Sequence, residues 1–191
     1  MSNPLFAIDA GHYIDTPGKR CLKSIDPGET REWVLNSRIA DKVQERLRGY
    51  RCATMRVDDV TGEKEISLSK RVALANQADA DLYLSFHHNA GIHGGSGGGC
   101  VVYVAPVAQE QSIVVQKAVY EAMLEDLDTA LQGLKTETAG MNTYDIWCGG
   151  DRALWAKVAN QLKLRIALRM VKVDPAQAET VARDAISAGV L

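Results

Sequence analysis

Short apolar runs, each bounded by polar or turn-forming residues, recur along the first half of the chain. A run of this kind that stops at glycine or at a cluster of polar residues is typical of a buried β-strand. The first run ends at Gly11-His12 and the third is stopped by His87-His88-Asn89. We therefore expect strands over four segments: Leu5–Asp9, Cys52–Val57, Asp81–Phe86 and Val101–Val104.

The segments between these runs have the periodicity of helices. From Thr30 to Arg48 the apolar residues recur every four positions, which predicts an amphipathic helix with Thr30 as its N-cap. The recurring residues are Leu35, Ile39, Val43 and Leu47. Further helices are expected over Leu68–Ala78, 109–126, 151–171 and 175–191. Asp151 is suited to cap the helix over 151–171, and Pro175 suits the first turn of the helix over 175–191. A strand within Leu164–Val173 is the alternative for part of the helix over 151–171.

Strands that alternate with helices predict an α/β fold with a largely parallel sheet flanked by helices. At 191 residues the chain has the length of about one domain. We find no internal repeat and no linker, and we expect a single domain over residues 1–191.

Composition narrows the classes of partner. Apolar residues make up 46% of the chain and charged residues 24%, and the net charge is −2 without any block of like charge. Nucleic acid is therefore a poor partner. No apolar run reaches the length of a membrane span, so membrane insertion is not expected. The four cysteines are far apart and lack CxxC spacing, which argues against a thiolate zinc site and favours free thiols.

The first residues lack both a basic segment and an apolar segment of the kind that signal peptides carry. We therefore expect no signal peptide, and a protein that stays in the cytoplasm until it is released to act elsewhere.

Three polar side chains lie where the predicted strands end or a helix begins. His12 follows the first strand, Glu32 lies in the first turn of the next helix, and His87 follows the third strand. Sites in open α/β sheets collect beyond the carboxyl ends of the strands. Two imidazoles and a carboxylate, with a fourth position left to water, form the ligand set of catalytic zinc in several hydrolases. The sequence therefore offers these three residues as ligands of one zinc ion.

Each of these residues also has a simpler interpretation. A histidine after a strand is often only a hydrogen-bonding loop residue, and an acid in a first turn favours the helix dipole. His88 points to the opposite side if the strand continues, so we expect only one histidine of the pair to bind metal. His93 lies in the glycine-rich loop Gly91–Gly99 and is expected to face solvent or substrate.

Four motifs follow one another over about residues 5–105. They are Ile-Asp-Ala-Gly-His12, Glu32-Trp-Val-Leu-Asn36, Ser67-Leu-Ser-Lys-Arg71 with Ala75-Asn76, and Ala80-Asp-Leu-Tyr-Leu-Ser-Phe-His87-His-Asn89-Ala90. In this order they resemble the N-acetylmuramoyl-L-alanine amidases of the amidase-3 type. The resemblance makes the single domain expected over residues 1–191 a catalytic domain, without a separate wall-binding domain.

The resemblance implies one zinc ion held by His12, Glu32 and His87, with Glu29 as the second choice of carboxylate. It implies an α/β sandwich around a mixed sheet, related in layout to zinc carboxypeptidases. The implied reaction is hydrolysis of the amide between N-acetylmuramic acid and L-alanine, so the implied partners are the glycan strand and stem peptide of peptidoglycan. The matched Arg71 and Asn76 suit structural roles, on a helix whose apolar residues Leu68, Val72 and Ala75 are expected to face the core. Asn89 suits support of His87.

The family also uses a second glutamate, late in the chain, as general acid and base. The C-terminal third offers Glu137 and Glu179, and neither follows the apolar strand that precedes this residue in the family. The general acid or base therefore stays unassigned. Two alternatives to an endolysin-like or autolysin-like amidase remain. One is a non-catalytic or weakly active peptidoglycan-binding zinc domain. The other is a zinc exopeptidase, which lacks an obvious arginine to clamp a terminal carboxylate.

Overall fold

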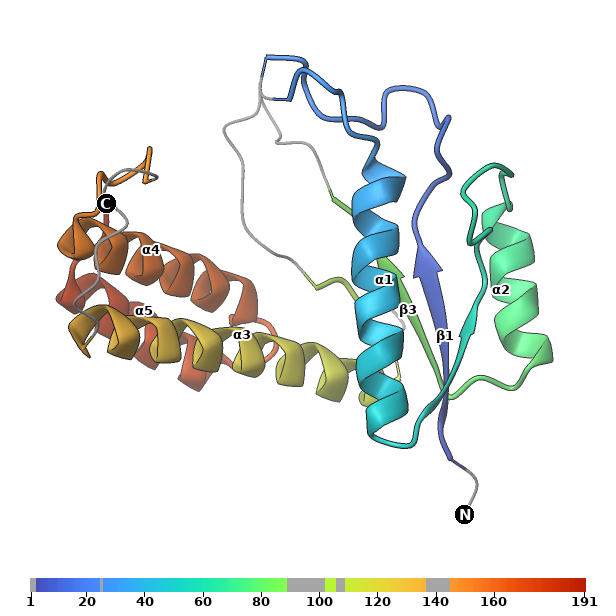
Figure 1. Ribbon diagram of the computed structural model, residues 1–191. Coiled ribbons are helices and arrows are strands. Elements are labelled where there is room, and N and C mark those ends of the chain that lie inside the picture. Colours follow the sequence, from blue (N-terminus) through green and yellow to red (C-terminus); the bar gives the residue numbers. More distant parts are fainter. Residues whose placement is uncertain (1–2, 25, 89–101, 106–108, 137–144) are drawn as a thin grey trace. The chain divides into compact units, whose positions relative to one another are not determined.

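The computed structural model describes all residues except 1–2, 25, 89–101, 106–108 and 137–144 (Figure 1). Contacts divide the chain into two compact units, Met1–Gly97 and Gly98–Leu191, and each is described by itself. This division does not decide how many domains the protein has, and the single catalytic domain stays a prediction. Among the described residues, no helix combines the length and apolar character that crossing a bilayer requires.

A three-stranded parallel sheet forms the centre of the first unit. Its strands are β1 (Leu5–Ala10), β2 (Ala53–Arg56) and β3 (Leu82–Phe86), in the order β2-β1-β3. Because β1 is central and carries a helix on each face, its last four residues are buried, which explains its continuous apolar run. The predicted α/β fold with a parallel sheet flanked by helices is confirmed, as are the first three predicted strands.

Helices α1 (Glu32–Gly49) and α2 (Leu68–Gln77) cover opposite faces of this sheet (Figure 1). On one face Ile8 and Ala10 of β1 pack with Trp33 and Ala40 of α1. On the other face Ala7 of β1 packs in a cluster that contains Val57 and Ala75. The alternation of side chains along β1 therefore directs its odd-numbered residues, Asp9 included, toward α2.

The start of α1 differs from the prediction. Its N-cap is Arg31, without a side-chain capping bond, instead of Thr30. Thr30 belongs to the preceding loop, because its N–H donates to Asp26 Oδ2 at 2.7 Å and its carbonyl accepts from Cys21. The predicted stripe is confirmed in part, because Val43 and Leu47 pack against the cluster around Ile8. Ile39 is 39% exposed, and the buried positions of α1 are Glu32, Trp33, Asn36, Ser37, Ala40 and Gln44.

Helix α2 presents another side to the sheet than its apolar residues predict. Leu68 and Val72, expected in the core, are 71% and 42% exposed, whereas Ala75 is buried as expected. The other buried residue of α2 is Arg71, only 5% exposed. A charged side chain lies inward here because Asp9 and backbone carbonyls of the loop after β1 satisfy its donors.

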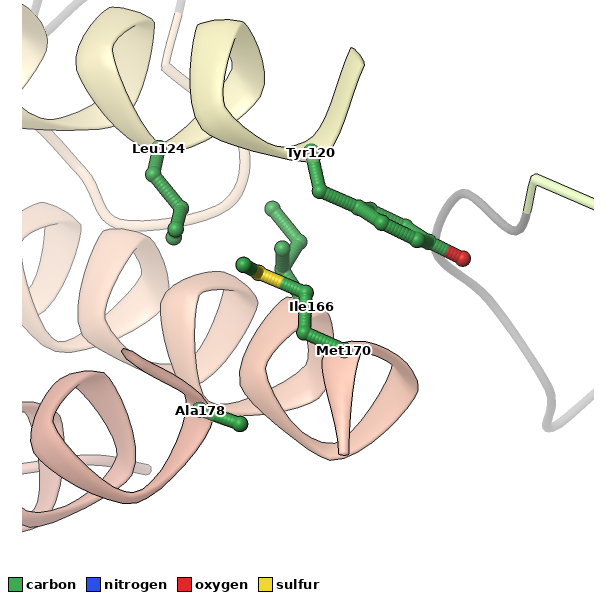
Figure 2. Packing of buried hydrophobic residues seen from close by; sticks show 5 residues of the cluster. All are labelled: Tyr120, Leu124, Ile166, Met170 and Ala178. Carbon is green, nitrogen blue, oxygen red and sulfur yellow. The ribbon is translucent and has the colours of Figure 1, made fainter. Parts of the chain in front are cut away.

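The second unit contains the helices α3 (Glu110–Thr136), α4 (Arg152–Met170) and α5 (Pro175–Ala188). Figure 2 shows its core, in which side chains from all three helices meet. These side chains are Tyr120, Leu124, Ile166, Met170 and Ala178. Asp151 caps α4 and Pro175 lies in the first turn of α5, as predicted.

Two strand expectations in this unit are wrong. Residues Leu164–Met170 belong to helix α4, so no strand forms there. In the predicted fourth strand, residues 102–104 are irregular, and Val101 lies outside the described residues. The backbone of Val102 has other partners: its N–H donates to the Tyr120 hydroxyl, and its carbonyl accepts from Gln116 Nε2. Because its N–H and its carbonyl both bind side chains of α3, Val102 does not pair with a neighbouring strand.

Candidate metal centre

Three side chains converge at the carboxyl end of the first unit's sheet. They are His12 in the loop after β1, Glu32 at the first position of α1, and His87 directly after β3. One potential ligand atom from each residue lies within 4.8 Å of the other two. His12 Nε2 is 3.4 Å from Glu32 Oε1, and His87 Nδ1 is 3.2 Å from the same oxygen. The structure thus brings together the three residues that the sequence singled out.

Gly11 makes the close approach of the two histidine loops possible. Its N–H donates to the carbonyl of Phe86 at 3.0 Å, which continues the pairing of β1 with β3. A Cβ atom on Gly11 would lie only 2.1–2.6 Å from ring atoms of His87. Only a residue without a side chain therefore lets the His87 ring lie against this backbone.

The backbone of His12 is in the left-handed region, with φ of 72°. A residue with a side chain occupies this region at a cost of about 1–2 kcal/mol. This conformation turns the chain sharply after β1, and the imidazole faces Glu32 and the edge of the His87 ring. Such a conformation persists only where surrounding contacts hold it.

Glu32 is buried, with 5% exposure, but its carboxylate is well supported. Oε1 accepts the backbone N–H of His88 at 3.1 Å, and Oε2 is 3.9 Å from Lys19 Nζ. The backbone N–H of Glu32 donates to the carbonyl of Lys19. The position in the first turn of α1 adds the favourable field of the helix N-terminus. These contacts hold the carboxylate between the two histidines.

Asn36 connects the loops that carry the two histidines. Its Nδ2 donates to the carbonyl of Gly11 at 2.9 Å, and its Oδ1 is 2.8 Å from Nδ1 of His88. His88 is thereby engaged outside the three-residue group. The motif that contains Asn36 does not by itself indicate this role, although its place one turn after Glu32 puts both residues on the same face of α1.

Burial lowers the pKa of His12 below its usual value, a shift that the charge of Glu32 opposes and that of His87 reinforces. The imidazole of His12 is therefore neutral near pH 7, the form in which it binds a metal. Its Nε2 is buried, and despite the nearby Glu32 oxygen it has no hydrogen-bond partner of acceptable geometry. Such an unsatisfied buried atom calls for an explanation, and a cation is one.

The two histidine–glutamate spacings fit a zinc ion. Zinc binds nitrogen and oxygen at about 2.0–2.2 Å in a tetrahedron, which places neighbouring ligand atoms about 3.4 Å apart. The two histidine–glutamate distances, 3.4 and 3.2 Å, agree with this separation. The side chain of His87 is 40% exposed, so one side of the group is open to solvent, as a fourth position for water requires.

The other sequence candidates lie apart from this group or outside the described residues. Glu29 pairs with Arg20 at 3.1 Å, and Asn76 is exposed. Glu179 pairs with Arg183 on α5 in the second unit. Asn89, His93 and Glu137 lie outside the described residues. Among the residues that the structure describes, His12, Glu32 and His87 form the group without a second carboxylate.

Comparisons with known proteins give different results for different parts of the chain. The family described as "SusD-like: Susd and RagB outer membrane lipoprotein" matches residues 99–191. A SusD-like protein from Bacteroides thetaiotaomicron VPI-5482 is 38% identical, with a TM-score of 0.37. The match covers 39% of this chain and 16% of that protein. No curated protein matches the sequence.

Two solved N-acetylmuramoyl-L-alanine amidases are also similar to this chain. The catalytic domain from Bacillus (Paenibacillus) polymyxa var. colistinus is 18% identical, with a TM-score of 0.49, over 68% of this chain and 65% of that one. The amidase from Clostridium difficile 630 is 23% identical, with a TM-score of 0.51, over 67% of this chain and 66% of that one. The likeness to the second amidase shows a shared α/β fold.

Proposed function

We propose that this protein is a zinc-dependent N-acetylmuramoyl-L-alanine amidase, in which His12, Glu32 and His87 hold one Zn²⁺. The observation that supports this most directly is the convergence of the three side chains around a buried, unpartnered His12 Nε2. The amidase-type motifs of the sequence and the shared α/β fold agree with this activity.

When bound, zinc polarises an amide carbonyl and lowers the pKa of a coordinated water. The chain's own residues prepare the site for this chemistry. Burial keeps His12 neutral, so that Nε2 offers a lone pair. The His88 N–H and Lys19 hold the Glu32 carboxylate in place on its remaining sides. The exposure of His87 leaves room for an extended substrate to approach.

The proposed substrate is the peptidoglycan glycan strand with its stem peptide, cleaved between N-acetylmuramic acid and L-alanine. The proposed setting is cell lysis or wall turnover, by a protein that is cytoplasmic until it is released. A membrane-permeabilising partner or rupture of the mother cell would supply that release. Nucleic acid is not proposed as a partner, because the net charge is −2.

Chelation tests the metal mechanism. Purified protein should lose lysis of isolated sacculi after treatment with a chelator and regain it when zinc is restored. Activity that survives complete metal removal would contradict the proposal. Product analysis then separates the enzyme classes: new L-alanine amino termini support the amidase, whereas free terminal amino acids support the exopeptidase.

A second candidate function is a non-catalytic or weakly active peptidoglycan-binding zinc protein. One observation favours it: the described group lacks a second carboxylate. General acid–base help is worth about 10²–10⁴-fold, so its loss would leave a slow enzyme rather than none. Sedimentation of the zinc-loaded protein with sacculi, without release of peptide during long incubation, would favour this candidate.

A further inference from the structure

Arg71 is a buried cation close to the metal group that the proposed chemistry does not use. Its Nη2 donates to the carbonyl of His12 at 2.8 Å, and its Nη1 donates to the carbonyl of Ala10 at 3.0 Å. Its Nε donates to the carbonyl of Ile66, in the segment that precedes α2. One guanidinium therefore joins α2 to the loop that carries the first histidine of the group.

Asp9 anchors this guanidinium. Its Oδ1 accepts from Arg71 Nη1, and its Oδ2 accepts from the hydroxyls of Tyr83 at 2.9 Å and Ser85 at 2.7 Å. Tyr83 and Ser85 belong to β3, the strand that ends next to His87. Burial, together with the charge of Asp9, raises the pKa of Tyr83 well above its usual value, so Tyr83 remains a donor. The network thus reaches both strands that lead to the histidines.

We infer that Arg71 is a positioning residue for the metal group. Its hydrogen bond to the His12 carbonyl holds His12 in the left-handed conformation that directs Nε2 to Glu32. The inference rests on the proposed function, since it concerns zinc binding at that site. With φ of 72° His12 needs an external restraint, and the bond from Arg71 acts on the same residue. Loss of this hydrogen bond should misplace one of the three ligands without removing any of them.

This role requires the planar shape of the guanidinium in addition to its charge. Arg71 donates from Nε to the carbonyl of Ile66, and from Nη1 and Nη2 to acceptors within residues 9–12. A lysine ammonium is a point charge on a flexible side chain and cannot reproduce this arrangement of donors. Arg71→Lys therefore keeps the charge opposite Asp9 and removes the geometry. Substitutions that disturb the support of a metal ligand typically weaken metal binding about 10–100-fold.

The test is the zinc dissociation constant of Arg71→Lys, compared with wild type and with Arg56→Lys. Arg56 is a matched control: its side chain is 8% exposed and joins Asp41, Asp58 and Ser37, none of which belongs to the three-residue group. We expect Arg71→Lys to bind zinc about 10–100-fold more weakly, with an altered visible spectrum of the cobalt(II) form. Arg56→Lys should lower the melting temperature and bind zinc as wild type does.

Wild-type zinc affinity and an unchanged cobalt spectrum in Arg71→Lys would overturn the inference, as would equal weakening in both variants. If Arg71→Lys does not fold, Tyr83→Phe decides, because it removes one anchor of Asp9 and retains the ring. Weaker zinc binding by Tyr83→Phe supports the inference, and unchanged binding overturns it. Wild-type protein that binds no zinc would instead overturn the proposed function itself, so the two failures are distinguishable.

Discussion

At the scale of the residue, the metal group leaves no room for a side chain at position 11. Gly11 lies where the His87 ring passes, so the absence of a side chain at position 11 is as much a requirement of the site as the ligands are. Its role is steric, whereas Asn36 and Arg71 act by hydrogen bonds to the same short stretch of chain.

Gly11→Ala is therefore expected to weaken zinc binding by about tenfold or more, because the new Cβ would displace the His87 ring. Gly49→Ala is the matched control, since a Cβ there meets nothing within 4 Å. Isothermal titration with zinc measures both variants. Wild-type affinity in Gly11→Ala would mean that the ring can move aside without loss of the site.

The neighbouring histidines should differ in their effect on metal content. His87→Ala should lose bound zinc, because one of three converging ligands is removed. His88→Ala should retain it, because the support of Glu32 comes from the His88 backbone N–H and survives the substitution. Metal analysis of the purified variants checks this. Equal zinc in wild type and His87→Ala would show that another residue is the ligand.

At the scale of the element, the turn before α4 is organised by one carboxylate. Asp145 accepts backbone N–H groups from Trp147, Cys148 and Gly150, and the indole N–H of Trp155 at 2.6 Å. These bonds, that of Cys148 first, hold the pKa of Asp145 at about 2, below the usual 3.8. The turn thus connects to the first turns of α4 through an ionised side chain.

Asp145→Asn should lower the melting temperature at neutral pH, because the amide keeps only one acceptor oxygen for these donors. Since the folded pKa lies below the unfolded one, the carboxylate stabilises the fold above pH 3.8, and this is lost as the pH falls through about 2. The difference in melting temperature between wild type and variant should therefore shrink over that range. Thermal unfolding at several pH values measures it, and a constant difference would contradict this account.

At the scale of the whole molecule, the two compact units have separate cores and only the first contains the metal group. Met170 is fully buried in the core of the second unit. Met170→Ala should cost about 2–5 kcal/mol of stability through the cavity it leaves. Under conditions in which the chain stays folded, its zinc affinity should equal that of wild type.

Denaturant unfolding of Met170→Ala also tests the prediction of a single domain. One shared transition that shifts as a whole would support a single cooperative domain over residues 1–191. A shift confined to one of two transitions would contradict it. Zinc affinity that falls with Met170→Ala would show that the second unit contributes to the metal group.

The sequence by itself determined the elements and the identity of the three converging residues. Runs of apolar residues specify β1, β2 and β3, and capping chemistry specifies the starts of α4 and α5, because these signals act over a few neighbouring positions. The carboxyl ends of parallel strands share one edge, so the ordered motifs ending in His12 and His87 could be assigned to one site.

Only the tertiary structure decided which side of each helix faces the sheet and what supports the ligands. Arg71 displaces Leu68 and Val72 from the core because its partners lie 59–62 positions away, and Asn36 reaches a carbonyl 25 positions away. Local periodicity carries no information on such partners, since a buried polar side chain is tolerated only where distant groups satisfy it.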